Sequence, residues 1–278
     1  MKKAVKIITT VIAIFLILGP LEVNAFVGNP VSRYLVDRNS DIYIEEHYSD
    51  LDLVKEIGFE VTKNRYYVKL KSETIKDLYF TLDYSLTGQL INDLYENNIT
   101  EGWNVIMRLQ EDYRNETDII FEALKDNPLF KETDSFFTSA YLMNKIDDEH
   151  MPAVFEDRSG GIDGTTLELD KEYDLEQMGA MGGVIDIAVQ FLDGDESYEH
   201  GAKVLQEIKT TLDEANIGFY YINLAIFNEE GNYAYRFDFF PYSEIDSDNL
   251  IEKINASIST TQKYYDEINA RTLKVKED

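Results

Sequence analysis

Apolar and polar side chains alternate along three stretches near the start of the chain, residues 57–62, 66–71 and 78–84. Because successive side chains of a strand point to opposite faces of a sheet, this alternation predicts three strands that each bury one face. The polar segments at residues 62–65 and 85–88 predict turns, and a short strand over "QLI" follows the second turn. The side chains expected to point inward are Ile57, Phe59, Val61, Tyr66, Val68, Leu70, Leu78, Phe80, Leu82 and Tyr84.

Helical spacing of apolar residues predicts a helix on each side of these strands. Asn29 is a favourable N-cap and Pro30 suits the first helical position, so the first helix is expected from Pro30 to about Tyr48. Its expected buried face carries Val31, Leu35 and Ile42. A second helix is predicted over residues 103–125, where an apolar stripe would close the unit. That stripe consists of Val105, Ile106, Leu109, Tyr113, Ile120, Ala123 and Leu124.

The second half of the chain shows a different order of elements. Alternation over residues 184–191 predicts a strand, and helical spacing over 196–215 predicts a helix after it. Two further strands, 219–227 and 232–239, are joined by "NEEG" as a hairpin. An apolar stripe over residues 250–268 predicts a final helix. The predicted order is therefore β-α-β-β-α.

Residues 126–175 lack a sustained period, and we place a connecting segment there. Within it "SFFTSAYLMNKI" is predicted as a short helix and "DRSGGIDGTT" as a loop. The segment would separate an N-terminal module of residues 29–125 from a C-terminal module of residues 176–270. Strand runs grouped with helices are typical of the α+β class. We therefore expect two small α+β modules, each an antiparallel sheet packed against helices.

Residues 1–25 have the three parts of a signal peptide. Lys2, Lys3 and Lys6 precede the apolar run "IITTVIAIFLIL", and "VNA" ends the segment with small residues at cleavage-site positions. The alternative is a retained membrane anchor, but the run is short for a bilayer span of about 20 residues. We expect cleavage after Ala25. Both interpretations place the folded part outside the cytoplasm.

The charge and the cysteine count exclude several classes of function. The chain has 26 Lys+Arg against 53 Asp+Glu, a formal net charge of -27, so it would repel nucleic acid and anionic lipid headgroups. We expect no nucleic-acid partner, and membrane contact only through residues 1–25 if they are uncleaved. The absence of cysteine excludes disulfides, thiolate metal sites and cysteine nucleophiles. In an exported protein it also suggests a Gram-positive source.

The N-terminal half carries a recognisable series of segments. An apolar leader is followed by "GNPVSRYLV", "YIEEHYSDLDL", "NRYYVKLKS" and "KDLYFTLDYSLTGQLIND". This series resembles the N-terminal module of the uncharacterised YfjL-like proteins of Bacillus-type bacteria. The similarity continues through "WNVIMRLQEDY" and "DLEQMGAMGGVIDIAVQF". "LDYSLTGQLI" is also similar to part of PepSY modules, which pack a helix on an antiparallel sheet. Neither resemblance implies a catalytic residue.

Candidate chemistry is sparse. His47, His150 and His200 stand in no metal-binding spacing. "IDDEH" at residues 146–150 and "LDGDESYEH" at 192–200 could supply cation ligands, but solvated loops and a helix start explain them better, with Asp195 as the expected cap. Gly179, Gly182 and Gly183 precede a strand, which favours a bend over a phosphate-binding loop. We identify no catalytic, cofactor-binding or metal-binding residues, and expect no cofactor.

Aromatic side chains gather in the predicted second hairpin. Tyr233, Tyr235, Phe237 and Phe239 are expected on one face, either as a sheet core or as a partly exposed interaction surface. The full set consists of Tyr220, Tyr221, Tyr233, Tyr235, Phe237, Phe239, Phe240 and Tyr242.

The sequence thus favours an exported or membrane-tethered, non-catalytic protein, a binding or regulatory module at the cell envelope. Its partner would be an envelope or extracellular protein, or a cation. One alternative is a metal-dependent or acid/base hydrolase, and another is a purely structural envelope protein.

Overall fold

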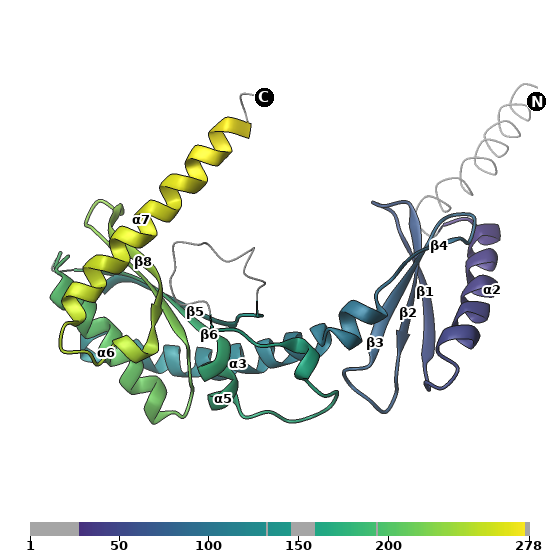
Figure 1. The fold of residues 1–278 in the computed structure, drawn as a ribbon, viewed down its shortest axis with the longest axis horizontal. Helices are drawn as coiled ribbons and strands as arrows, with labels where there is room; N and C mark the ends of the chain where they lie inside the picture. The colour runs from purple at the N-terminus through teal and green to yellow at the C-terminus, as the bar shows by residue number, and fades with distance from the viewer. Residues whose placement is uncertain (1–27, 132, 146–158, 193, 276–278) are drawn as a thin grey trace, which may run out of the picture. The chain divides into compact units, whose positions relative to one another are not determined.

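The computed structural model of the protein describes residues 28–131, 133–145, 159–192 and 194–275. The described chain forms two compact units, shown in Figure 1. The first consists of residues 28–104 with 168–170, and the second of the other described residues. The predicted leader and the "IDDEH" stretch lie outside the described residues.

The first unit is an antiparallel sheet with a helix on one face (Figure 1). Its elements are α2 (Pro30–His47), β1 (Val54–Glu60), β2 (Arg65–Lys71), β3 (Tyr79–Tyr84), β4 (Leu90–Asp93) and a short π-helix, Glu96–Thr100. The strands lie in the order β1-β2-β3-β4, so each pairs with its neighbour in sequence. The predicted helix, strands and turns are confirmed here.

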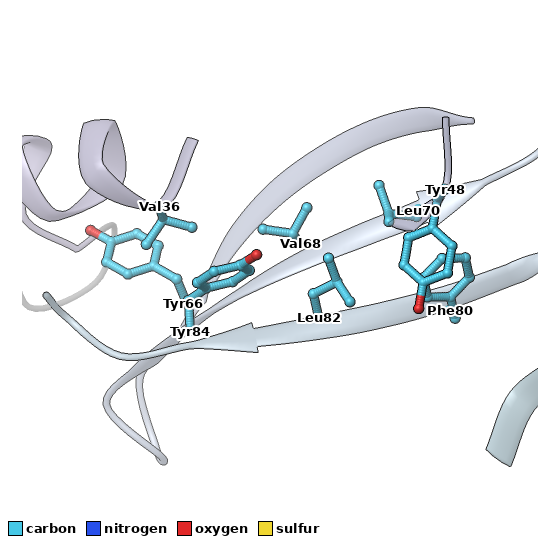
Figure 2. Packing of buried hydrophobic residues seen from close by; sticks show 8 residues of the cluster. All are labelled: Val36, Tyr48, Tyr66, Val68, Leu70, Phe80, Leu82 and Tyr84. Atoms are coloured by element: carbon cyan, nitrogen blue, oxygen red, sulfur yellow. The ribbon is translucent and has the colours of Figure 1, made fainter. Parts of the chain in front are cut away.

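The alternation of period two correctly identified the buried rows of this sheet. Tyr66 pairs with Tyr84, Val68 with Leu82 and Leu70 with Phe80, and Figure 2 shows these side chains packed together with Tyr48 and Val36. Phe80 is 1% exposed. Val61 was wrongly placed in this core. It follows the end of β1, lies in the turn and is exposed.

The predicted buried face of α2 was also wrong. Val31 and Ile42 are 68% and 47% exposed, whereas Val36 and Ser40 are fully buried and Tyr43 and Ile44 pack against the core. Ser40 hid this face in the sequence, because a serine does not count as an apolar position. Its hydroxyl donates a hydrogen bond of 2.9 Å to the carbonyl oxygen of Asp37, which makes its burial acceptable.

The second unit holds a mixed four-stranded sheet. Its elements are α3 (Trp103–Leu124, of which residues 105–124 belong here), α4 (Pro128–Lys131), β5 (Thr133–Leu142), α5 (Leu175–Gly182), β6 (Gly183–Phe191), α6 (Tyr198–Glu214), β7 (Tyr221–Phe227), β8 (Tyr233–Pro241) and α7 (Leu250–Val275), with 3-10 turns at Gly164–Thr166 and Tyr242–Glu244. The strands lie in the order β5-β6-β7-β8. The α+β class is confirmed.

We expected this second sheet to be purely antiparallel, and that prediction is wrong. β6 and β7 run parallel, whereas β5–β6 and β7–β8 are antiparallel. A parallel pair needs a crossover connection, and α6 provides it. The helix buries Val204, Leu205, Ile208 and Leu212 and packs on β7. On β6, Ile185, Ile187 and Val189 are buried as predicted.

The boundary between the units differs from the predicted connecting segment. The helix expected to close the first module belongs, from Val105 onward, to the second unit. Tyr113 of α3 explains this, because its hydroxyl donates a 2.8 Å hydrogen bond to the carbonyl oxygen of Gly218 in that unit. The segment predicted as a short helix forms strand β5 instead. Its partner β6 comes much later in the chain, so no local pattern could show the pairing.

Candidate functional site

A row of polar side chains crosses the face of the second sheet opposite to the Ile185–Ile187–Val189 side. Ser139 on β5 pairs in register with Asp186 on β6, and Asp186 pairs with Asn223 on β7. Because side chains at paired positions share a face, all three lie next to one another. Asp186 and Asn223 are half-buried and Ser139 is exposed.

Hydrogen bonds join these three residues into one network. The hydroxyl of Ser139 donates to Asp186 Oδ2 at 3.0 Å, and the amide Nδ2 of Asn223 donates to Asp186 Oδ1 at 2.6 Å. Asn223 Oδ1 in turn accepts a hydrogen bond of 2.6 Å from the backbone N–H of Phe239 on β8. Each carboxylate oxygen of Asp186 therefore has a donor, and its side chain is held in one orientation.

The β8 end of the row is a bulge. Ile222 pairs with Phe240 but Leu224 pairs with Phe237, so Asp238 and Phe239 together stand opposite Asn223. Phe239 has φ 55°, a left-handed conformation that is strained for a bulky residue. The N–H of Asp238 donates to Thr261 Oγ1 on α7 at 2.9 Å. Side chains of β7 and α7 thus satisfy the two bulge N–H groups.

Asp238 is 4% exposed, and both oxygens of its carboxylate accept a hydrogen bond. It accepts hydrogen bonds from Arg236 Nε at 2.8 Å and from the Tyr265 hydroxyl of α7 at 2.9 Å. Burial and the nearby Asp238 charge raise the pKa of Tyr265 to about 12. Burial, with Asp186 contributing, raises the pKa of Tyr141 to about 12 as well. Both phenols therefore stay protonated at neutral pH.

This row borders a groove of about 410 Å³, which we call the sheet-B groove. Small side chains of Ala188 and Ala225 line it, and Phe137 and Tyr233 stand at 68% and 57% exposure. The ring of half-buried Phe227 lies 4.7 Å from the ring of Tyr233. The full lining is Phe137, Thr138, Ser139, Asp186, Ile187, Ala188, Asn223, Leu224, Ala225, Phe227, Tyr233, Arg236 and Asp238. The groove thus combines a fixed polar network with accessible aromatic surface.

A second pocket of about 400 Å³ lies where α5, the residues before β7 and the turn after β8 meet. Beside it, Lys209 Nζ lies 2.6 Å from Asp213 and 3.2 Å from Asp246, and 4.5 Å from the centre of the Tyr242 ring. These contacts tie the end of α6 to the segment between β8 and α7. The sheet-B groove differs from this pocket in having exposed aromatic rings beside a fixed polar row, and we take it as the candidate site.

Two family models match the chain. One, described as YfjL-like, N-terminal domain, matches residues 1–92, and the other, described as YfjL-like C-terminal domain, matches residues 113–255.

The chain belongs to the YfjL-like family.

No curated protein and no solved structure matches it. The four residues Ser139, Asp186, Asn223 and Asp238 all fall within the YfjL-like C-terminal domain, whereas Thr261 and Tyr265 lie beyond the matched range. The resemblance to the YfjL-like group is therefore confirmed. The bacterial group and the similarity to PepSY modules stay predictions.

The candidate residues named from the sequence of this YfjL-like chain do not meet in one place. His47 ends α2, where its ring stacks on Tyr43 at 4.1 Å. His200 is buried at the start of α6, stacked on Phe191 at 3.8 Å, with Nδ1 3.0 Å from Asp195 Oδ2. His150 lies outside the described residues.

The cap predicted for α6 was wrong. Ser197, not Asp195, accepts the hydrogen bond from His200 N–H, while Asp195 accepts from Ser197 N–H one step earlier. Asp195 and Ser197 each accept a hydrogen bond from a backbone N–H two or three residues later, and both precede the first residue of α6. Both are good cap residues, and their order could not be decided from residue type.

In the described part of the chain, no three His, Cys, Asp or Glu side chains are close enough to hold a metal ion together. None of the described helices is sufficiently long and apolar to span a bilayer.

The polar site residues that sequence reasoning missed are Ser139, Asp186, Asn223 and Asp238. One signal was available, since Asn223 interrupts the apolar run "FYYINLAIF". An amide in such a strand needs a partner when it is buried. Its partners, however, come from the neighbouring strand and from a bulge, which the sequence does not display.

Proposed function

We propose that this protein is a non-catalytic binding or regulatory module at the cell envelope, which holds a ligand in the sheet-B groove. The observation that carries the proposal is the hydrogen-bond network of Ser139, Asp186 and Asn223 beside the exposed rings of Phe137 and Tyr233. Polar groups fixed in advance lose little entropy when a ligand binds. Exposed aromatic rings are the residue type that supplies binding energy at interfaces.

The proposed location rests on the leader. A basic start, an apolar run and small residues at Val23–Ala25 favour export. Fractionation of cells followed by N-terminal sequencing tests it. A mature protein starting at Phe26 supports cleavage, and an intact leader in the membrane fraction supports an anchor on the outer face of the cytoplasmic membrane. Full-length protein in the soluble cytosolic fraction would overturn both forms.

The binding role can be tested with a random-peptide display library selected against the purified mature protein. Phe137→Ala and Tyr233→Ala should each weaken binding of the selected peptides by about tenfold, because an aromatic contact residue is worth more than 1 kcal/mol. Ile119→Ala and Leu192→Ala are the matched controls, because both side chains are also exposed, at 67% and 63%, and neither lines the groove. Equal effects of all four changes would refute the groove as the binding site.

The alternative of a metal-dependent or acid/base hydrolase has one point in its favour, which is that Asp186 and Asp238 flank Asn223 on one face. Each carboxylate accepts two hydrogen bonds in the structure, so as a catalytic acid or base it would have to act through a lone pair that these bonds leave unused. Turnover of a peptide or ester library that Asp186→Asn abolishes would favour this alternative over the binding role.

A further inference from the structure

Strand β5 forms an edge of the second sheet that differs from the other three edges of the two described sheets. It is ten residues long, and no described strand pairs with its outer side. An edge strand carries backbone N–H and C=O groups that point away from the sheet, so it can act as a template for another strand. Proteins usually block such edges.

The other edges are blocked in recognised ways. β4 has only four residues, and β1 carries charge at Lys55, Glu56 and Glu60. β8 packs along α7, and the side chain of Thr261 on α7 accepts a hydrogen bond from the backbone N–H of Asp238. Short length, charge and a covering helix each prevent strand addition.

β5 has none of these protections over most of its length. Its sequence, "TDSFFTSAYL", contains no Lys, Arg or Pro, and its one charge, Asp134, lies near the start. Phe137 in the middle is 68% exposed. The strand also contributes Phe137, Thr138 and Ser139 to the sheet-B groove, so the open edge and the groove adjoin.

We propose that β5 accepts an extended, basic segment of a partner protein as a fifth strand of this sheet. Backbone hydrogen bonds to β5 would supply affinity, and alternate side chains of the added strand would lie beside the groove and supply specificity. A lysine or arginine on that face can reach across Ser139 towards Asp186. This inference rests on the proposed binding function and names its partner class.

The net charge favours a partner protein over a second copy of this chain as the occupant of the β5 edge. Each copy carries a formal net charge of -27, so pairing two β5 edges would bring two strongly acidic molecules together. Asp134 and Asp186 would add repulsion close to the contact. A basic segment would instead be attracted to the same acidic groups.

The test uses a cyclic β-hairpin peptide whose free strand alternates threonine or valine with lysine. It should bind the mature protein, and glutamate in place of lysine should abolish binding. N-methylation of the alternate residues whose N–H groups face outward from the free strand should weaken binding by about tenfold or more, because it removes the donors. N-methylation of the residues that face the other hairpin strand would disrupt the probe, so the control is a hairpin methylated on its lysine side chains, which keep their charge.

Three outcomes would overturn the inference. If the lysine hairpin binds equally well with and without backbone methylation, the groove recognises side chains alone and the proposed function stands without strand addition. If library-selected peptides bind but no hairpin does, β5 is not the docking edge. If the mature protein dimerises in sedimentation and the lysine hairpin competes with that dimer, the occupant is a second copy. Failure of both hairpins and the library would refute the proposed function itself.

Discussion

Asn223 and Phe239 are joined by a hydrogen bond of 2.6 Å, from the backbone N–H of Phe239 to the side-chain carbonyl of Asn223. This contact supports a left-handed residue near the end of β8 and at the same time orients the amide that donates to Asp186. The strained backbone and the polar row are therefore parts of one structure.

Replacing Asn223 by Ala should lower the free energy of unfolding by about 1–3 kcal/mol, because the bulge N–H and one oxygen of Asp186 lose their partners. Urea unfolding followed by circular dichroism measures the change. Asn255→Ala is the matched control, since Asn255 is exposed on α7. A loss for Asn223→Ala no larger than for the control would show that the bulge does not depend on this side chain.

The two cores can be tested with one large-to-small change in each sheet. Phe80→Ala should cost about 3–5 kcal/mol and Ile187→Ala about 2–5 kcal/mol, because both side chains are at least 97% buried. Phe137→Ala and Ile119→Ala remove the same side chains from exposed positions and should stay within about 0.5 kcal/mol of wild type. A loss below about 1 kcal/mol at Phe80 or Ile187 contradicts the assigned faces.

The tyrosines of the first unit predict a loss of stability at high pH. Asp93 Oδ2 accepts hydrogen bonds from the hydroxyls of Tyr43 at 2.9 Å and Tyr48 at 2.5 Å. Burial, and then the hydrogen bond and charge of Asp93, raise the pKa of Tyr43 to about 12 and that of Tyr48 further. Burial also raises the pKa of Tyr84 to about 12.

A folded-state pKa above the unfolded value of 10 means that the folded unit favours the protonated phenol. Its contribution to stability is complete below pH 10 and falls as the pH rises towards about 12. Unfolding by urea across this window, with phenolate absorbance recorded in parallel, should show stability falling as the phenols ionise. Asp93→Asn should lower the pH at which Tyr43 ionises. Ionisation of every tyrosine near pH 10 while the unit stays folded would contradict the prediction.

Close packing at Gly179 predicts that alanine is not tolerated there. A Cβ on Gly179 would collide with the carbonyl oxygen of Gly218 and lie 2.9 Å from the ring of Tyr113. Although alanine favours a helix, the overpacking should lower the free energy of unfolding by about 1–3 kcal/mol. Met181→Ala on the exposed side of α5 is the control for the helix. If Gly179→Ala were as stable as this control, the backbone of residues 217–219 would have room to move.

How well an element could be predicted depended on how far apart in the sequence its paired residues lie. The hairpins of the first sheet were visible in the sequence, since Val68, Leu70, Phe80 and Leu82 alternate and their partners lie one turn away. β5 was not visible, because Phe136 pairs with Val189 and Ala140 with Ile185, and these partners lie far along the chain. Its run of small, aromatic and hydroxyl side chains is compatible with either a helix or a strand.

The aromatic hairpin was only partly predicted, for a similar reason. Tyr235 and Phe237 are buried as one core row, but Tyr233 is 57% exposed, and Phe240 rather than Phe239 continues the row. Each register shift in the β7–β8 pairing moves the following side chains to the other face. A bulge has no fixed residue signature, so the candidate site that depends on it could not be found from the sequence.

The late pairing of β5 has a consequence for the folding pathway. The first sheet contains only contacts between neighbouring strands, which close quickly, whereas the second sheet needs the ends of a long loop to meet when Leu142 pairs with Gly183. During synthesis the N-terminal strands emerge first, and β5 emerges before β6 exists. For that interval β5 is exposed along both edges. A factor that shields extended segments during translocation or folding would find its target in this strand.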